Sequence, residues 1–338
     1  MNTLTRFRKP LQYILAIVAI VCIAIVVANN WTSFVAAVAS MNPAWIFGSL
    51  LFGILGVVLS MLAWRSVARA FGYPVSVRSS ANIVFISQIG KYIPGGVWPI
   101  VVGSRLGAAA GIPAVTTAIT LMVQLLMSVA TGCVVAVGVL LTFPTLAAHY
   151  WWLIVIVLVV GIGALLPPVM ARWLRFVLKL LRRSDQLPSV IRLGDMGVAT
   201  LWSIGSWVAF GLHLWCILTA LDGVDPGTIV LAISGYALAW VAGFIAILAP
   251  AGAGVREAVL GLILAASFTT SDILGIVLVS RFVLIVVDLG LFAFALATSR
   301  RVRHDPTLAI IAAAQAAGAT QTVQPAVKPG DPAQPTAG

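Results

Sequence analysis

Basic residues stand inside two apolar stretches of this chain, and proline and glycine interrupt both stretches. The first stretch runs from Asn82 to Gly103 and carries Lys91 near its centre. The second runs from Ala249 to Leu260 and carries Arg256 and Glu257. Cationic side chains beside unpaired backbone N–H groups bind phosphate oxygens well. These two stretches therefore indicate a site for an anionic group.

The broken backbone of the first stretch predicts its surroundings. Proline lacks an N–H donor and glycine adds backbone entropy, so we expect no continuous helix through the Pro94-Gly95-Gly96 run. In hydrocarbon, backbone groups freed in this way need neighbouring protein or a wet cavity. A lysine at the same place favours a cavity over lipid. The alternative is that Lys91 and Arg105 only extend to the membrane interface.

The second stretch predicts the start of a helix. Pro250 and Gly252 end the preceding helix, and a new one is expected from Gly254 with Arg256 and Glu257 in its first turn. The planar guanidinium suits a phosphate. Glu257, the single glutamate of the chain, is a helix stabiliser, a proton-coupling group or the counter-ion of Lys91 or Arg256, and we favour the counter-ion.

Two further charges lie on the last apolar segment. Arg281 and Asp288 are seven residues apart and so share a helix face. Asp288 is close to the middle of the segment, where an unpaired charge is costly, so we expect it to pair with Arg281 or Arg256. His213 is expected to be a hydrogen-bonded buried histidine.

The candidate substrate-binding residues come from both broken stretches, with one charge pair beside them. They are Gln88, Gly90, Lys91, Tyr92, Pro94, Gly95, Gly96, Trp98, Arg105, Pro250, Gly252, Gly254, Arg256 and Glu257, with the pair Arg281 and Asp288. The sequence contains no zinc-protease, serine-hydrolase or phosphate-loop motif. We therefore expect a transporter rather than an enzyme, with no cofactor and no metal, although lipid-modifying chemistry stays an open alternative.

The composition places these segments in a membrane. The 338 residues are 61% hydrophobic and 9% charged, with a mean hydropathy of +1.11. Runs of about 20 apolar residues cross a bilayer as helices. We predict an all-α polytopic membrane protein of about eight transmembrane helices, at 11–28, 44–63, 113–142, 150–170, 196–219, 228–248, 254–270 and 272–298.

The basic residues alternate between the loops in a way that predicts orientation. Arginine and lysine follow the second, fourth and last predicted spans, while the loops around 29–43, 143–149 and 220–227 contain none. Positive loops stay cytoplasmic, so both termini are expected on the cytoplasmic side of the cell membrane. The segment 82–105 must then enter and leave on the cytoplasmic side as a re-entrant element. The net charge of +11 therefore indicates an anionic membrane surface and no nucleic acid.

Two regions lie outside the predicted spans. Residues 172–195 form either an amphipathic helix on the anionic inner leaflet or a solvated loop. Residues 1–303 are expected to form one transmembrane domain, and residues 304–338 a cytoplasmic tail, largely disordered because alanine, proline and glycine dominate it. Any internal repeat between the two broken stretches is expected to be parallel.

The two motifs resemble a known family. Gly90-Lys-Tyr-Ile-Pro-Gly-Gly-Val-Trp98, followed by Pro250-Ala-Gly-Ala-Gly-Val-Arg-Glu257, is similar to the membrane region of lysylphosphatidylglycerol synthases, which also occurs alone as flippase-like proteins. The second motif has Ala251 and Ala253 where the family usually has glycine. The resemblance spans about residues 10–300.

The resemblance implies a membrane domain that moves lipids across the bilayer. In the bifunctional relatives an attached soluble synthase makes the aminoacylated lipid. Here we expect no soluble synthase domain after the last span, only a short tail, and therefore no lysyl transfer. The expected substrate is an anionic phospholipid or a polyprenyl-phosphate-linked glycolipid, moved by a flippase- or scramblase-like mechanism. The alternative is a non-catalytic partner that anchors or assembles a glycosyltransferase or a lipid synthase.

Overall fold

The fold is built from α-helices, as the sequence predicts. The computed structural model describes residues 31–92, 97–166, 168–169, 172, 192–222, 226–245 and 254–302, and no strand occurs among them. Five helical segments in this part of the chain are long and apolar enough to cross a membrane. They are α4 (Pro43–Ala70), α7 (Ala114–Ala136) with α8 (Gly138–Leu141), α12 (Leu193–Asp222), α13 (Thr228–Ile245) and α15 (Thr270–Val302).

Three predicted spans have a different outcome. The span at 150–170 is α10 (Trp151–Leu165), an apolar helix that falls short of the length of the other five. The span at 254–270 is replaced by α14 (Val255–Leu264), whose ten residues extend only about 15 Å. A hydrocarbon core is about 30 Å thick, so α14 does not cross it alone. The predicted span at 11–28 lies outside the described residues.

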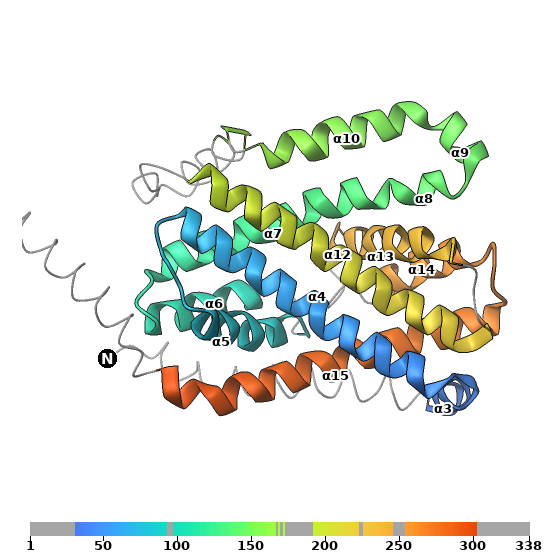
Figure 1. Ribbon diagram of the computed structural model, residues 1–338, viewed down its shortest axis with the longest axis horizontal. Helices are drawn as coiled ribbons and strands as arrows, with labels where there is room; N and C mark the ends of the chain where they lie inside the picture. Colours follow the sequence, from blue (N-terminus) through green and yellow to red (C-terminus); the bar gives the residue numbers. More distant parts are fainter. Residues whose placement is uncertain are drawn as a thin grey trace, which may run out of the picture.

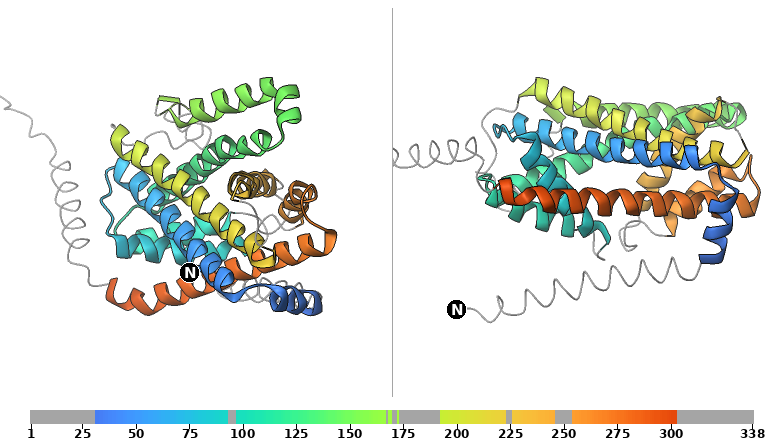
Figure 2. Two further views of the ribbon diagram at one scale, coloured as in Figure 1. Left: turned by 45° about the vertical axis from the view of Figure 1, so that its right-hand side comes forward. Right: turned by 60° about the horizontal axis from the view of Figure 1, so that its bottom comes forward.

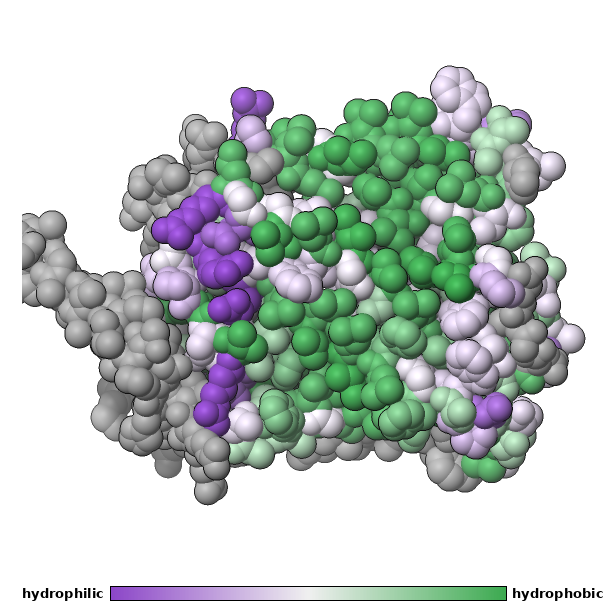
Figure 3. Space-filling model, viewed as in Figure 1, coloured by the Kyte–Doolittle hydropathy of each residue, from purple (hydrophilic) through white to green (hydrophobic). Residues whose placement is uncertain are grey.

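The face of the molecule in Figure 3 has a broad hydrophobic belt and one strongly hydrophilic end. Contacts between distant segments bring the arginines to that end. Arg69 pairs with Asp195 at 3.2 Å, Arg65 donates to the Val75 carbonyl and Arg78 donates to the Thr298 carbonyl. We call this the arginine end. It comprises the end of α4 and the start of α12, together with the start of α5 (Val77–Gln88) and the end of α15.

The core forms along α4 and α12, which lie side by side. Among the described helices these two make the most extensive contact, and α15 runs beside them (Figure 2). They are antiparallel: Arg69 meets Asp195 at one end, and the Asn42 N–H donates to the Ala220 carbonyl at the other. Two further described helices, α3 (Trp31–Ser40) and α9 (Pro144–His149), are short.

Two helix–hairpin–helix units make up this core. In the first, α4 is followed by the hairpin of α5, η1 (Ile89–Tyr92) and α6 (Trp98–Ala109), and then by α7. In the second, α12 is followed by the hairpin of α13 and α14, and then by α15. The first hairpin lies toward the arginine end, and the second toward the opposite end (Figure 1). We call them the first and second hairpins.

The two units are related as an inverted repeat. The hairpin helix α5 packs against α15 of the other unit, and α13 packs correspondingly against α7. In the same way α7 contacts α12, and α15 contacts α4. Because α4 and α12 run in opposite directions, the prediction of a parallel repeat is wrong. The prediction assumed that residues 254–270 cross the membrane, which would give the helices beside the second broken stretch the same direction as those beside the first. The short α14 does not meet this assumption.

Candidate functional site

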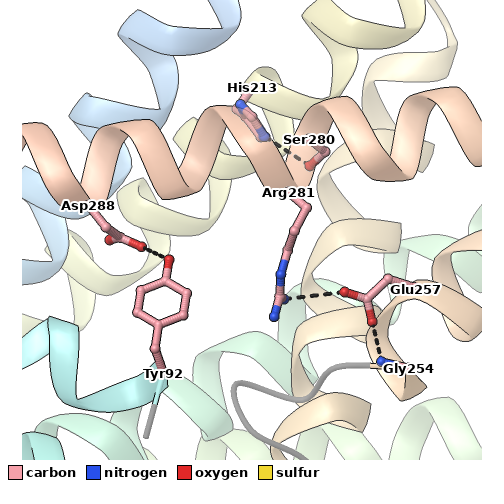
Figure 4. A network of polar contacts seen from close by, with 7 residues as sticks. All are labelled: Tyr92, His213, Gly254, Glu257, Ser280, Arg281 and Asp288. Carbon is pink, nitrogen blue, oxygen red and sulfur yellow. Dashed lines mark hydrogen bonds and ion pairs between the residues drawn. The ribbon is translucent and has the colours of Figure 1, made fainter. Parts of the chain in front are cut away.

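The first hairpin is joined to the middle of α15 by a buried carboxylate. The Lys91 Nζ lies 2.7 Å from Oδ2 of Asp288, and the Tyr92 hydroxyl donates to the same oxygen at 2.5 Å (Figure 4). The Asp288 side chain is only 2% exposed, whereas that of Lys91 is 35% exposed. Both donors come from η1, directly before the Pro94-Gly95-Gly96 break. An ammonium and a hydroxyl therefore stabilise one carboxylate well inside the protein.

The second hairpin is joined to α15 through Glu257. One carboxylate oxygen accepts the Gly254 N–H at 2.6 Å, and the other lies 3.3 Å from Nη1 of Arg281 (Figure 4). Gly254 has φ +87°, a backbone conformation that favours glycine. Glu257 thus stabilises the start of α14, as one of the expected roles requires, and it also pairs with α15, although its partner is Arg281 and not Lys91 or Arg256.

Arg256 lies on an aromatic ring instead of in an ion pair. Its guanidinium carbon is 4.4 Å from the centre of the Tyr236 ring, a cation–π distance. Tyr236 is 2% exposed and stacks on Phe210 with 5.4 Å between ring centres. Among the described residues, the carboxylates of Glu257 and Asp288 pair with Arg281 and Lys91, and neither forms an ion pair with Arg256.

His213 is a hydrogen-bonded buried histidine, as predicted. Its Nδ1 lies 2.7 Å from the Ser49 hydroxyl and its Nε2 lies 3.0 Å from the Ser280 hydroxyl. The bond to Ser280 ties α12 to α15 (Figure 4), and the bond to Ser49 ties α12 to α4. Ser280 precedes Arg281, so the histidine fixes the turn of α15 that holds the second hairpin.

The structure changes the expected charge pairs. The sequence predicts that Glu257 balances Lys91 or Arg256, but it pairs with Arg281. The sequence also predicts that Asp288 pairs with Arg281 or Arg256, but its partners are Lys91 and Tyr92. The reason is that each hairpin meets a different turn of α15, and sequence spacing does not show which turn that is.

The other candidates fall into three groups. Gly90 and Trp98 face each other where η1 meets α6, since a Cβ on Gly90 would come within 2.7 Å of the Pro99 backbone. Gln88 is half-buried at the end of α5, and Arg105 is exposed on α6 and is not a member of the ion pairs described above. The remaining candidates lie outside the described residues: Pro94, Gly95, Gly96, Pro250 and Gly252.

Sequence reasoning missed Tyr236. It is the single tyrosine of the predominantly apolar α13, and it lies between Arg256 and His213, with 6.2 Å between the Tyr236 and His213 ring centres. A buried tyrosine usually has a partner for its hydroxyl. A tyrosine inside an apolar span was therefore a signal that could have identified this position.

Among the described residues, the charge network has an excess of cations. Lys91, Arg256 and Arg281 face the two carboxylates Asp288 and Glu257, all around the central part of α15. The undescribed stretches 93–96 and 246–253 contain no ionisable side chain, so they add no charge to this count. Such a site favours one added negative charge. In the described part of the chain, no three histidine, cysteine or carboxylate side chains gather as a metal site would require.

Comparison with known proteins identifies the family of this chain. No curated protein matches the chain. The sequence model of the family described as "Lysylphosphatidylglycerol synthase TM region" matches residues 13–291. This range includes both hairpins, α4, α12 and the charged turns of α15. The chain is a multi-pass membrane protein, and it belongs to the lysylphosphatidylglycerol synthase TM region family.

Proposed function

We propose that this protein is a flippase- or scramblase-like translocator that moves an anionic lipid across the cytoplasmic membrane. The observation that carries the proposal is the charge network, in which two interrupted hairpins meet one transmembrane helix through buried or half-buried ions. Ionised groups at membrane depth are energetically costly, and they therefore usually mark functional sites. A phospholipid or a polyprenyl-phosphate-linked glycolipid supplies the negative charge that the network favours.

The arrangement supports a path for the lipid headgroup. A phosphate that enters between the hairpins can replace the carboxylates as partner of Lys91 and Arg281, and Arg256 supplies the additional cation. The acyl chains stay in the bilayer, against the apolar outer surface (Figure 3). Inverted repeats with broken helices are typical of transporters whose site lies near the membrane midplane.

The proposed topology places the arginine end in the cytoplasm, as positive charge dictates. The first hairpin is then re-entrant from the cytoplasmic side, and the second hairpin is re-entrant from the outer side. A re-entrant hairpin returns the chain to the side of the membrane from which it entered. A pair of full spans does the same, so the orientation of all later segments is unchanged. Both termini therefore stay cytoplasmic, and the number of full spans stays even.

Reconstitution tests the proposal directly. Vesicles that contain the protein receive a fluorescent phosphatidylglycerol or a fluorescent polyprenyl phosphate, and an impermeant quencher reports how much probe changes leaflet. We expect wild-type protein to move at least one probe, and Lys91→Ala and Arg256→Ala to abolish the movement. Arg78→Ala is the matched control, because Arg78 is an exposed arginine at the arginine end. A folded wild-type protein that moves neither probe would contradict the proposal.

The alternative is a partner that anchors or assembles a glycosyltransferase or a lipid synthase without transport. The observation that favours it is the arginine end, with exposed Arg78 and Arg192, together with exposed Arg105 on α6. A partner of this kind tolerates Lys91→Ala and Arg256→Ala, and is sensitive to changes in the segment 172–195. Measuring lipid movement and complex formation on the same variants separates the two functions.

A further inference from the structure

Asp288 depends on donors that a lipid phosphate would compete for. A single oxygen, Oδ2, accepts both the Lys91 ammonium at 2.7 Å and the Tyr92 hydroxyl at 2.5 Å. The carboxylate is 2% exposed, so water replaces neither donor readily. If Lys91 turns toward a phosphate, Asp288 keeps only a neutral hydroxyl. A buried carboxylate that loses its cation is strongly destabilised, and it regains stability by taking up a proton.

We propose that this protein couples lipid movement to protons, with Asp288 as the group that takes up one proton when an anionic headgroup binds Lys91. The inference rests on the proposed lipid transport and adds its energy source. In the empty state Lys91 pairs with ionised Asp288. In the occupied state Lys91 pairs with the phosphate, and Asp288 is a neutral carboxylic acid beside Tyr92.

The step balances in charge and in atoms. The ion pair between the Lys91 ammonium and Asp288 breaks, and an ion pair between that ammonium and a phosphate oxygen forms. One proton from bulk water adds to a carboxylate oxygen of Asp288, and no other bond changes. The headgroup brings one negative charge and the proton brings one positive charge, so the net charge of the site does not change.

Ionisable groups from several helices surround Asp288. The ionisable groups near it are Lys91 and Tyr92 on η1, Arg281 on α15, Arg256 and Glu257 on α14, Tyr236 on α13 and His213 on α12. The α4 and α5 arginines belong to the arginine end, and α3 has no ionisable residue.

Glu257 is a poorer candidate for proton uptake. It is 28% exposed, and the Gly254 N–H keeps bonding its second oxygen at 2.6 Å even when Arg281 turns away. A carboxylate at a helix N-terminus is also stabilised by the helix dipole. His213 has a hydroxyl partner on each ring nitrogen. The loss of Lys91 thus leaves Asp288 with the greatest need for a proton.

The charge balance also defines the substrate class. A phosphodiester, such as phosphatidylglycerol or a sugar linked through one polyprenyl phosphate, carries one negative charge and leaves the site as it was.

The experiment uses vesicles of neutral lipid with a trace of fluorescent phosphatidylglycerol, with or without the full-length protein. The lumen is set one pH unit above the outer medium, and the impermeant quencher measures the probe in each leaflet at steady state. One proton per lipid predicts about tenfold accumulation in the inner leaflet, because linkage fixes the ratio at about tenfold per pH unit. A luminal pH dye should report acidification that requires both protein and probe.

The outcomes separate this inference from the proposed function. Accumulation with lumen acidification supports coupling. Movement to an equal distribution keeps lipid transport and overturns coupling. No movement in any gradient overturns both. This measurement needs only the wild-type protein, so it stands even if a variant fails to fold.

Two variants then test whether Asp288 is the proton acceptor. Asp288→Asn resembles the protonated side chain, so we expect it to move probe without accumulation and with no dependence on the pH gradient. Asp195→Asn is the matched control, since Asp195 pairs with Arg69 at the arginine end, and we expect it to accumulate probe like the wild type. A folded Asp288→Asn protein that still accumulates probe, or that moves none, would remove Asp288 from this role.

Discussion

Proline and glycine interrupt the sequence of both hairpins, but the two hairpins hold their charged residues differently. The first hairpin presents Lys91 to a carboxylate on α15 that is almost fully buried. The second presents Glu257 to Arg281, and both of these side chains are about a quarter exposed. Buried ion pairs are costly to break from one side, whereas exposed pairs contribute little. The first hairpin is therefore the more strongly anchored of the two.

Their glycines differ in the same way. Gly90 is needed for space, because a Cβ there would lie 2.7 Å from the Pro99 nitrogen and 2.8 Å from the Trp98 carbonyl carbon. Gly254 has open space around it, but its φ of +87° is one that side chains with a Cβ rarely adopt. Glycine at position 90 thus permits close backbone contact, and glycine at position 254 permits the positive φ at the start of α14.

The largest expected effect breaks the first anchor. Lys91→Met leaves the Asp288 carboxylate buried beside Tyr92 alone, and we expect a loss of about 3 kcal/mol in the free energy of unfolding. Arg281→Met, which breaks the more exposed pair, should lower it by only about 1 kcal/mol. Denaturation in mixed micelles, followed by tryptophan fluorescence, measures both. Equal losses for the two variants would mean that the hairpins are anchored alike.

A second comparison concerns space at the first hairpin. Gly90→Ala places a methyl group against the backbone of Trp98 and Pro99, which has no flexible side-chain end to move. We expect a loss of about 2 kcal/mol, typical of overpacking. Gly290→Ala is the control, because Gly290 lies in α15 and an added methyl group there would meet open space. If the two variants unfold at the same denaturant concentration, close packing does not hold η1 against α6.

The smallest expected effect concerns the turn of the second hairpin. Gly254→Ala should lower the free energy of unfolding by about 1 kcal/mol, since the positive φ disfavours a Cβ. Gly254→Asn should lose a similar amount, because φ +87° with ψ −54° lies outside the left-handed helical region that asparagine tolerates. The same denaturation assay ranks the three proteins. A ranking with asparagine below alanine would indicate that the space around residue 254, and not its φ, sets the stability.

Much of the architecture was predictable from local patterns. The long apolar segments in the described region became α4, α7 with α8, α12, α13 and α15 at nearly the predicted bounds. Apolar composition over about 20 residues is sufficient for that result, because each helix satisfies its own backbone hydrogen bonds. The ten-residue α14 was not predictable in the same way, since apolar residues continue to Ala266 after the helix has ended at Leu264.

The charged residues were identified by type and position, and their pairing was not. Lys91, Arg256, Glu257, Arg281 and Asp288 stand out in any apolar sequence, because each ion in hydrocarbon needs a partner. Which ion pairs with which depends on where each hairpin touches α15. Tyr92 and Asp288 are 196 positions apart along the chain, and nothing in the local sequence around either residue records that they meet.

The sequence alone thus determined that this is an α-helical membrane protein with a basic end and two interrupted segments, since composition and backbone chemistry act locally. Only the tertiary structure decided that the two units are inverted, that Asp288 holds both Lys91 and Tyr92, and that Tyr236 lies under Arg256. Those features arise from packing between helices that are distant in the sequence, where small differences in shape and burial select one arrangement.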